Sequence, residues 1–407
     1  MTKTKYAFAG ASLRALEMYG KPITNHFAQS AQVVGVFDIN PIRAQRVGEA
    51  CNNAPAFTDF DEMLRATQPD VVIVTTVDRY HHEYIIRSLR AGCDAITEKP
   101  MTIDDEKCRA ILAAEQETGR AVTVTFNYRF QPYVTKAKEL LRSGVIGPVY
   151  HVDFEWLLDR SHGADYFRRW HRRKENSGGL LVHKSTHHFD LVNWLLDSEP
   201  ERVFALGSRR FYGPTRQERG ERCSTCAYTQ SCEFYVDLAS RPGLNAHYFQ
   251  AEQHDGYFRD RCVFSEEIDI EDTMNVLVRY TNGAQMSYSL TAYSPYEGWY
   301  MVITGKDGRM ELREIESGPE SGGDTLEIRI FDKKGQLTKI DVPVGRGGHG
   351  GGDSVLLQRL FSGEDLPDPL NHMAGSRAGA MSILTGIAAN HAIASGQAVT
   401  VADLLKG

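Results

Sequence analysis

The 407-residue sequence lacks any apolar run long enough to cross a membrane, and Met1 to Tyr6 lead into a predicted strand rather than a secretion signal. It also lacks an excess of basic residues, since 46 Lys and Arg stand against 53 Asp and Glu for a formal net charge of -7. This balance argues against general binding to nucleic acid. We therefore expect a cytoplasmic protein with neither a membrane nor a nucleic-acid partner.

A secreted disulfide framework is also lacking, because the seven cysteines are odd in number and unevenly spread. Cys223, Cys226 and Cys232 lie close together in a polar stretch, and Cys262 follows downstream. Four thiolates can hold a structural zinc ion, although the spacing also permits an iron–sulfur cluster or free thiols. Because residues 209–264 offer few apolar side chains for a core of their own, we expect structural zinc.

The chain is too long for one typical core, so we predict two domains, residues 1–142 and 143–407, with a Cys-rich insertion near 209–264 in the second. In the first domain, short apolar runs alternate with helical stretches. That alternation predicts an α/β domain with a doubly wound parallel sheet, the nucleotide-binding architecture. The runs are Tyr6 to Ala9, Val33 to Phe37, Val71 to Val74, Cys93 to Ile96 and Ala121 to Thr125.

The turn after the first strand keeps one of the three glycines usual in a dinucleotide fold. Gly10, Ser12 and Ala15 stand at those positions, so residues stay small where the backbone must approach a pyrophosphate. Alone, this turn is equally typical of an ordinary strand-to-helix connection. Asp38 ends the second strand, where a carboxylate accepts ribose hydroxyls and repels a 2′-phosphate, so NAD is favoured over NADP despite nearby Arg43.

Glu98-Lys99-Pro100 follows the fourth strand at its carboxyl end, where ligands bind in open α/β sheets. Proline restricts the backbone after Lys99 and can aim the ammonium into the crevice. There it could hydrogen-bond a substrate hydroxyl and favour the developing alkoxide. A surface lysine before a turn is the alternative.

Gly178 to Leu196 concentrates polar side chains in an otherwise apolar helical pattern. On one helix His183, His187 and Asp190 would share a face, with Lys184 beside them. Because each of these groups must be solvated or paired when the helix packs, we interpret the stretch as an active-site helix. A solvated helix start is the alternative.

The segment from Arg160 to Lys174 reverses the acidic balance of the chain just before that helix. Arginine forks bind carboxylate, sulfonate or phosphate oxygens, so an anionic sugar substrate would explain the segment. Ion pairs at a domain or subunit interface would explain it equally well. Its notable residues are Arg160, His162, Tyr166, Arg168, Arg169, Trp170, His171, Arg172, Arg173 and Lys174.

The second domain should be α+β with a large, mostly antiparallel sheet. Val149 to Trp156 alternates as a strand would, and Thr281-Asn282-Gly283 separates two further strand patterns, a strong hairpin pattern. Two more hairpins are predicted within Tyr300 to Arg313 and Leu326 to Val342. Ala374 to Ala394 reads as a long helix of small and apolar residues.

Several of these motifs together resemble the Gfo/Idh/MocA oxidoreductases, which include glucose-fructose oxidoreductase and inositol dehydrogenases. The resemblance spans nearly the whole chain and implies that Lys99 orients the substrate against nicotinamide, that His187 is the acid/base and that His349 faces the sugar. It also implies a final helix returning to the first domain and a homodimer or homotetramer formed through the second-domain sheet. The motifs are Thr76 with His81, Glu98-Lys99-Pro100, Asn127-Tyr128-Arg129-Phe130, Gly178-Gly179 leading to His187 and Asp190, and Gly348-His349-Gly350-Gly351.

Combining the resemblance with the patterns above yields two sets of expected site residues. For the cofactor they are Gly10, Ser12, Leu13, Asp38, Arg43, Thr76, His81, Glu98, Lys99 and Asn127. For the substrate they are Arg129, Arg169, Trp170, His171, His183, Lys184, His187 and His349.

One position departs from the family pattern. Its dehydrogenases usually carry an aspartate four residues before the catalytic histidine, and here that residue is His183. The acceptor for substrate hydroxyls is therefore in doubt. His183 and His187 could instead hold a metal ion, but no third ligand is evident.

Three hypotheses follow for function. The first is an NAD-dependent oxidoreductase acting on a sugar, sugar acid or glycoside. The second is a glycoside hydrolase that uses NAD transiently, oxidising C3, eliminating the aglycone, adding water and reducing the ketone again, for example on sulfoquinovosides or uronides. The third keeps the fold as a non-enzymatic NAD sensor or scaffold.

Overall fold

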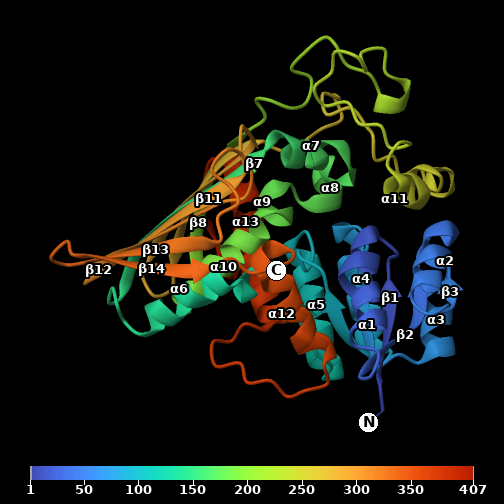
Figure 1. Ribbon diagram of the computed structural model, residues 1–407, viewed down its shortest axis with the longest axis horizontal. Coiled ribbons are helices and arrows are strands. Elements are labelled where there is room, and N and C mark those ends of the chain that lie inside the picture. The colour runs from blue at the N-terminus through green and yellow to red at the C-terminus, as the bar shows by residue number, and fades with distance from the viewer. Residues whose placement is uncertain (1, 407) are drawn as a thin grey trace.

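The computed structural model describes residues 2–406 and has two domains side by side, with the first at the right of Figure 1 and a large sheet at the left. The chain passes into the second domain after α6 (Pro132–Arg142), and the long helix α13 (Ser376–Ser395) runs back. α13 contacts the first domain and packs on the helices and sheet of the second. Across residues 2–406, no helix is both long and apolar enough to span a bilayer.

The first domain is built on six parallel strands in the order β3-β2-β1-β4-β5-β6, with β15 added antiparallel at one edge. The order reverses between β1 and β4, where ligands bind beyond the carboxyl ends of such strands. The predicted doubly wound sheet is confirmed. The strands are β1 (Thr4–Ala9), β2 (Ala31–Phe37), β3 (Ala56–Phe57), β4 (Val71–Val74), β5 (Asp94–Thr97), β6 (Val122–Val124) and β15 (Ala374–Gly375).

The helices of this domain start and stop at residues with clear physical roles. Asn40 caps α2 by accepting the Arg43 amide, and Asp104 caps α5 before it ends at Gly119 in the left-handed region. β3, with two residues, is too short for periodicity to predict. The helices are α1 (Lys21–Asn25), α2 (Pro41–Ala50), α3 (Phe60–Thr67), α4 (His81–Arg90) and α5 (Asp105–Thr118).

The second domain contains a nine-stranded sheet in the order β14-β13-β12-β11-β7-β10-β9-β8-β16. All neighbours are antiparallel except β7 and β10, so the large, mostly antiparallel sheet is confirmed. The strands are β7 (Val149–Asp159), β8 (Pro200–Ser208), β9 (Thr273–Tyr280), β10 (Gln285–Ser294), β11 (Gly298–Gly305), β12 (Gly308–Ile315), β13 (Thr325–Asp332), β14 (Leu337–Pro343) and β16 (Val399–Thr400).

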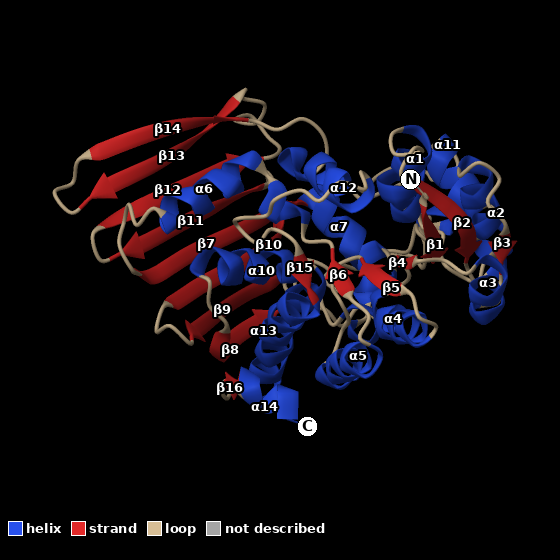
Figure 2. Cartoon of the chain, turned by 90° about the horizontal axis from the view of Figure 1, so that it is seen from below, coloured by secondary structure: helices blue, strands red, loops and turns tan. Residues whose placement is uncertain are grey.

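Helices cover one face of this sheet, as Figure 2 shows for α6, α10 and α13. Alternate residues of the strands are buried beneath them, including Val276 and Val278 of β9. Leu277 points the other way and is 57% exposed. The remaining helices are α7 (Arg160–Arg168), α8 (Lys174–Ser177), α9 (Leu180–His183), α10 (Ser185–Leu196), α11 (Pro242–Leu244), α12 (Gly352–Phe361) and α14 (Val401–Lys406).

The single helix expected across Gly178 to Leu196 is divided into α9 and α10 by a turn at Lys184. Lys184 keeps helical φ and ψ angles of −92° and −49°, so sequence periodicity does not register the break. Gly178 and Gly179 precede it with φ of 69° and 79°, conformations that other residues rarely adopt.

The predicted insertion leaves the sheet domain and reaches back over the first domain, above α2 in Figure 1. It contains only short helical turns, among them α11 and the turns Asn245–Phe249 and Glu252–His254. The turn Asn245–Phe249 contacts α2, so a segment of the second domain lies on the first.

Candidate active site

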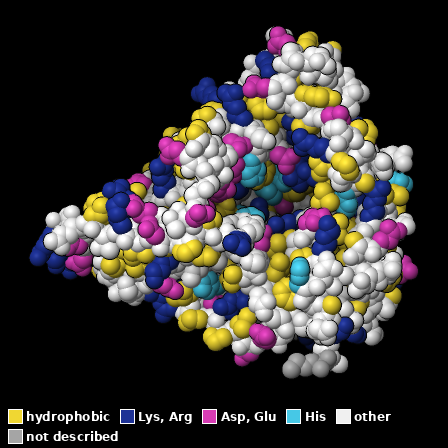
Figure 3. All heavy atoms as spheres, viewed as in Figure 1, with side chains coloured by type: hydrophobic (Ala, Val, Ile, Leu, Met, Phe, Trp, Pro, Cys, Tyr) yellow, Lys and Arg dark blue, Asp and Glu magenta, His cyan; other side chains and the backbone are white. Residues whose placement is uncertain are grey.

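A cavity of about 720 Å³ lies between the two domains at the carboxyl ends of β1, β2, β4 and β5. Figure 3 shows a hollow in this region with histidine, basic and acidic side chains on its walls. The cavity brings together most of the expected site residues. These are Ser12, Leu13, Asp38, Arg43, Thr76, His81, Glu98, Lys99, Arg169, Trp170, His171, His183, Lys184, His187 and His349.

The turn after β1 fits a dinucleotide. Gly10 has φ of 99°, and a Cβ there would lie 2.8 Å from the Thr76 backbone nitrogen, so only glycine is accommodated. Asp38 accepts hydrogen bonds from the amides of Ala11 at 2.7 Å and Asn40 at 2.8 Å. These bonds hold the carboxylate at the end of β2, where the ribose of NAD is expected.

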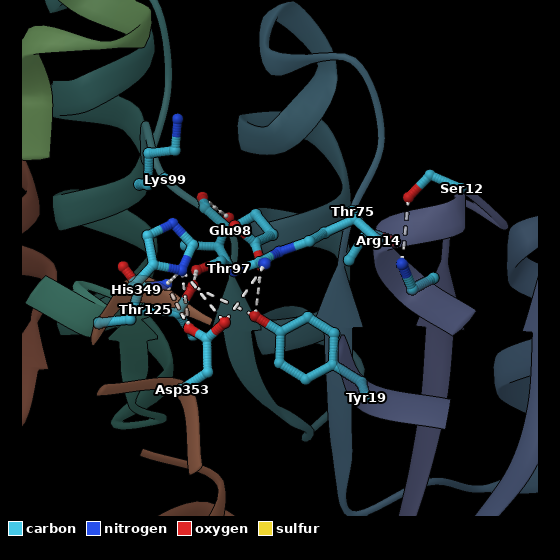
Figure 4. A network of polar contacts seen from close by, with 12 residues as sticks. Ser12, Arg14, Tyr19, Thr75, Thr97, Glu98, Lys99, Thr125, His349 and Asp353 are labelled. Carbon is cyan, nitrogen blue, oxygen red and sulfur yellow. Dashed lines mark hydrogen bonds and ion pairs between the residues drawn. The ribbon is translucent and has the colours of Figure 1, made fainter. Parts of the chain in front are cut away.

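A polar network joins this turn to a loop far along the chain (Figure 4). Glu98 accepts from Arg14 Nε at 2.6 Å and from the Tyr19 hydroxyl at 2.5 Å. Asp353 at the start of α12 lies 3.0 Å from His349 Nδ1. Asn127 lies behind this network, because its Nδ2 donates to Asp353 at 2.6 Å, so it orients the His349 loop without lining the cavity.

Lys99 points into the cavity and donates to the His183 carbonyl at 3.1 Å. Burial is the main cause that lowers its pKa to about 8, and the Lys184 ammonium lowers it further, while the Asp78 carboxylate raises it. The lysine is therefore cationic at neutral pH and titrates within an experimentally accessible range.

His187 is buried against Tyr128, with ring centroids 5.1 Å apart. Its Nδ1 is buried without a hydrogen-bond partner among residues 2–406, so Nε2 is the nitrogen available from the cavity. Burial, with Lys99, His349 and Lys184 nearby, holds the pKa of His187 well below its usual range. The imidazole is thus neutral at pH 7 and able to accept a proton.

Asp78 is an acidic residue of the cavity that the sequence-based prediction missed. Its carboxylate lies 2.5 Å from His183 Nδ1, and both side chains are buried. Burial raises the pKa of Asp78 and, with Lys99 close by, lowers that of His183. A carboxylate paired with imidazole therefore occupies the region where the family usually has an aspartate. The indication available in the sequence was that Asp78 lies just beyond the carboxyl end of β4, where ligands bind in such sheets.

Two predicted site residues are placed elsewhere. Arg129 forms a two-point buried ion pair with Asp190 at 2.7 and 2.5 Å and also donates to the Asn371 carbonyl. Neither residue lines the cavity. The expectations that Arg129 binds substrate and that Asp190 acts with the histidines are therefore not supported, because each ion neutralises the other inside the core.

The basic segment is mostly engaged with the insertion. Arg160 pairs with Glu233 at 2.9 Å, Arg168 donates to the Phe234 carbonyl at 2.8 Å, and Arg172 donates to the Cys262 carbonyl at 3.0 Å. Arg169 lines the cavity but is paired with Asp165 at 2.7 Å. Contacts with the insertion, inside the second domain, thus account for most of the cluster that had suggested an anionic sugar, and Arg160–Glu233 is an ion pair among them. The expected ion pairs at a domain or subunit interface stay a prediction.

The four cysteines of the insertion line one small cavity of about 20 Å³ with Arg168 and Arg216. Arg168 and Arg216 approach the sulfurs of Cys223 and Cys232 at 3.3 and 3.0 Å. Within the described part of the chain, no three His, Cys, Asp or Glu residues are placed to hold a metal ion. The zinc site expected at Cys223, Cys226, Cys232 and Cys262 is therefore not supported, nor is a metal held by His183 and His187.

A second cavity, of about 1090 Å³, adjoins the first and shares His162, Lys184 and His349 with it. Glu297 and Glu316 line it, and both lie near enough to Lys184 to favour its charged form. Nothing in the sequence pattern indicated this cavity, because its walls come from β11 to β13 and from loops distant in the chain.

Comparison with known proteins agrees with the fold. Residues 4–126 match the family described as oxidoreductase family, NAD-binding Rossmann fold, and residues 138–403 match oxidoreductase family, C-terminal alpha/beta domain. A Bacillus subtilis (strain 168) protein named as the oxidoreductase YteT is 39% identical over 425 residues, covering 98% of each chain. The D-glucoside 3-dehydrogenase of Escherichia coli (strain K12) is 28% identical over 165 residues, covering 40% of this chain and 46% of that protein.

The same fold occurs in levoglucosan dehydrogenase, solved with NADH and levoglucosan. Its structure covers 98% of this chain and 100% of its own, with a TM-score of 0.70 at 18% identity. The two family matches together span most of the chain, and the relative that is 39% identical is named as an oxidoreductase as well. The chain belongs to the Gfo/Idh/MocA family and is an NAD-dependent oxidoreductase.

Proposed function

We propose that this enzyme oxidises a secondary hydroxyl of a sugar or glycoside, with Lys99 and His187 as its two catalytic residues. The observation that carries the proposal is their placement in one cavity together with Asp38 and the turn after β1. Substrate and cofactor can therefore meet in this cavity, next to Lys99 and His187. The names of the relatives above, a glucoside dehydrogenase and a levoglucosan dehydrogenase, support a carbohydrate substrate.

Bound NAD supplies the acceptor for a hydride from the carbon that carries the hydroxyl. The neutral His187 takes the hydroxyl proton. Lys99 donates a hydrogen bond to the same oxygen and stabilises the negative charge that develops there. Asp78 and His183 position Lys99, because His183 offers it a carbonyl and Asp78 holds the His183 ring.

Lys184 is the group that we propose to contact the rest of the sugar. It is 5% exposed, lines both cavities, and has no hydrogen-bond or ion-pair partner for its ammonium within residues 2–406. The ammonium lies 4.8 Å from the centre of the Trp156 ring, a cation–π contact that leaves its hydrogen-bond donors open to a ligand. A hydroxyl or carboxylate oxygen of the substrate would accept from them, and this is the support that remains for an anionic sugar.

The second candidate function is an NAD-dependent glycoside hydrolase. The specific observation in its favour is the second cavity, which offers a leaving group room beyond Lys184. In that reaction C3 loses a hydride to NAD and becomes a ketone, which acidifies the proton on C2. Loss of that proton expels the aglycone, water adds to the resulting double bond, and the hydride returns to C3.

One experiment separates the two functions. The protein is incubated with NAD and a panel of neutral and anionic aryl glycosides while NADH and released aglycone are recorded together. Reduction of NAD without released aglycone, whether it appears as free NADH or as up to one enzyme-bound equivalent, identifies a dehydrogenase. Aglycone release that requires NAD but accumulates no NADH identifies the hydrolase.

Variants test the assigned roles. His187→Ala should lower kcat about 100-fold or more, because a general base contributes on the order of 10²- to 10⁴-fold. His391→Ala, at an exposed histidine of α13, is the matched control and should retain full activity. Equal activity of the two variants would contradict the role given to His187.

A further inference from the structure

The insertion makes several contacts with the part of the first domain that receives NAD. Leu13 lies in the turn after β1, which is expected to bind the phosphates of NAD and is called the phosphate-binding turn below. Its amide donates to the Tyr248 hydroxyl at 3.0 Å. His247 Nε2 lies 2.8 Å from the Ala11 carbonyl. Asn40, the cap of α2, donates to the Ala251 carbonyl at 2.8 Å. These bonds join residues more than 200 positions apart in the chain.

A second contact lies at the ribose end of the site. Arg43 donates to Asp38 at 3.0 Å and also to Asp255 of the insertion, and all three side chains are largely buried. Nη2 of the guanidinium is thus shared by two carboxylates and Nη1 is buried, so the side chain is poorly exposed to a 2′-phosphate. The insertion therefore removes the one cation that had left the choice of NAD over NADP open.

The insertion is also anchored on the opposite side of the cavity. Arg259 lies over the Tyr248 ring at 4.4 Å and reaches Asp165 of α7 at 3.9 Å. Arg222 pairs with Glu252 and Asp260, each at 2.8 Å, which braces the same segment. Leu244, Tyr248, Asp255, Tyr257 and Arg259 line the cavity from this side. Residues 242–259 therefore form a bridge between α7 and the phosphate-binding turn.

We propose that residues 242–259 form the outer wall of the dinucleotide site and that NAD is held there as a resident cofactor. A phosphate at the turn would compete with Tyr248 for the Leu13 amide, and the Tyr248 hydroxyl can then donate its own proton to that phosphate. Release of NAD then requires the Tyr248–phosphate bond to break along with the contacts of His247, Asn40 and Arg43 that hold the insertion in place, which slows dissociation.

A resident cofactor restricts the class of reaction. With such a cofactor, a hydride taken from a sugar carbon would have to be passed on within the same site before the next turnover. It can return to the oxidised sugar itself, as in the hydrolase, or pass to the carbonyl carbon of a second sugar, with a proton from the protein completing the new hydroxyl. In both cases the overall reaction produces no free NADH.

The test measures NAD release without any sugar, so it is independent of the proposed substrate. The purified protein is loaded with NAD, and the release rate is followed after dilution for the wild type, Tyr248→Phe and Tyr235→Phe. Tyr235 is in the same insertion, is 42% exposed and makes no contact with the first domain through its hydroxyl within the described chain, so it is the matched control. Tyr248→Phe should release NAD at least 5-fold faster than the other two.

Hydrogen exchange gives a second readout that a merely structural tyrosine would not move. Bound NAD should slow backbone exchange across residues 242–259. Equal release rates for the three proteins, or exchange in 242–259 that NAD leaves unchanged, would overturn the proposal. Retained NAD in a protein that oxidises no sugar would instead count against the proposed function and leave this inference standing.

Discussion

Lys99 carries a largely buried ammonium group whose charge depends on pH within the accessible range. Its ordinary pKa of 10.5 is lowered to about 8, mainly by burial. The protonated form, which donates to the substrate oxygen, is lost as the pH rises through that value. We therefore predict that kcat/KM falls above pH 8. No acid limb is expected near pH 6.5, because the pKa of His187 lies well below it.

The pH profile of Lys99→Arg checks this assignment. Arginine stays charged throughout the accessible range, so the residual activity of the variant should lose the limb near pH 8. A limb that persists unchanged in Lys99→Arg would mean that another group titrates there.

The charge of Asp78 also affects the pKa of Lys99. Its carboxylate raises the pKa of Lys99, so Asp78→Asn should move the alkaline limb to lower pH. The Asn oxygen can still accept from His183 Nδ1, so only the charge is lost. Because a hydrogen bond to a charged group contributes about 1 kcal/mol more than a neutral one, kcat should fall about 5-fold. Asp61→Asn, at an exposed carboxylate of α3, is the control. If the alkaline limb of the pH profile stays at the same pH in Asp78→Asn, Asp78 has only a structural role.

At the scale of elements, α13 determines where the catalytic helices lie. A Cβ added at Gly386 would stand 2.2 Å from the Leu181 carbonyl of α9. We predict that Gly386→Ala loses stability despite a helix-propensity gain of about 1 kcal/mol, because the backbone of α9 must move. Activity should fall with it, since α9 leads directly to Lys184 and His187.

Gly379→Ala in the same helix is the matched control. The atoms nearest its Cβ belong to the side chains of Val124 and Met101, which can adjust more easily than a backbone. Chemical denaturation should show a clearly smaller loss for Gly379→Ala. Equal losses would mean that the close approach of α13 and α9 is not what limits residue size.

At the scale of the whole molecule, the outer face of the large sheet carries apolar side chains in solvent, with Leu206 63% and Leu277 57% exposed. A contiguous apolar patch would favour association through this face, whereas single exposed leucines are common on monomers. A homodimer or homotetramer through this face, expected from the family resemblance, stays a prediction. Leu277→Lys should then yield monomers in sedimentation, whereas Leu337→Lys, at the β14 edge and 41% exposed, should not. Wild-type protein that is monomeric at micromolar concentration would refute it.

Local patterns in the sequence determined much of the architecture. The apolar runs after Tyr6, Val33 and Val71 and the hairpin at Asn282-Gly283 predicted parallel and antiparallel strands correctly, because alternation and turn chemistry act within a few residues. The order of motifs around Lys99 and His187 likewise led to the family. Short strands such as β3 lacked enough residues to show a period.

Only the tertiary structure decided which charged groups became partners. Arg129 pairs with Asp190, Asp78 pairs with His183, and the basic segment contacts the insertion. From the sequence alone, each of these groups could have faced a ligand. Such choices depend on which distant segments the fold brings within hydrogen-bond reach and leaves buried together, and burial makes each group take the partner it meets. For the same reason the sequence could place Cys223 and Tyr248 in one insertion, but not reveal that the segment contacts the dinucleotide turn.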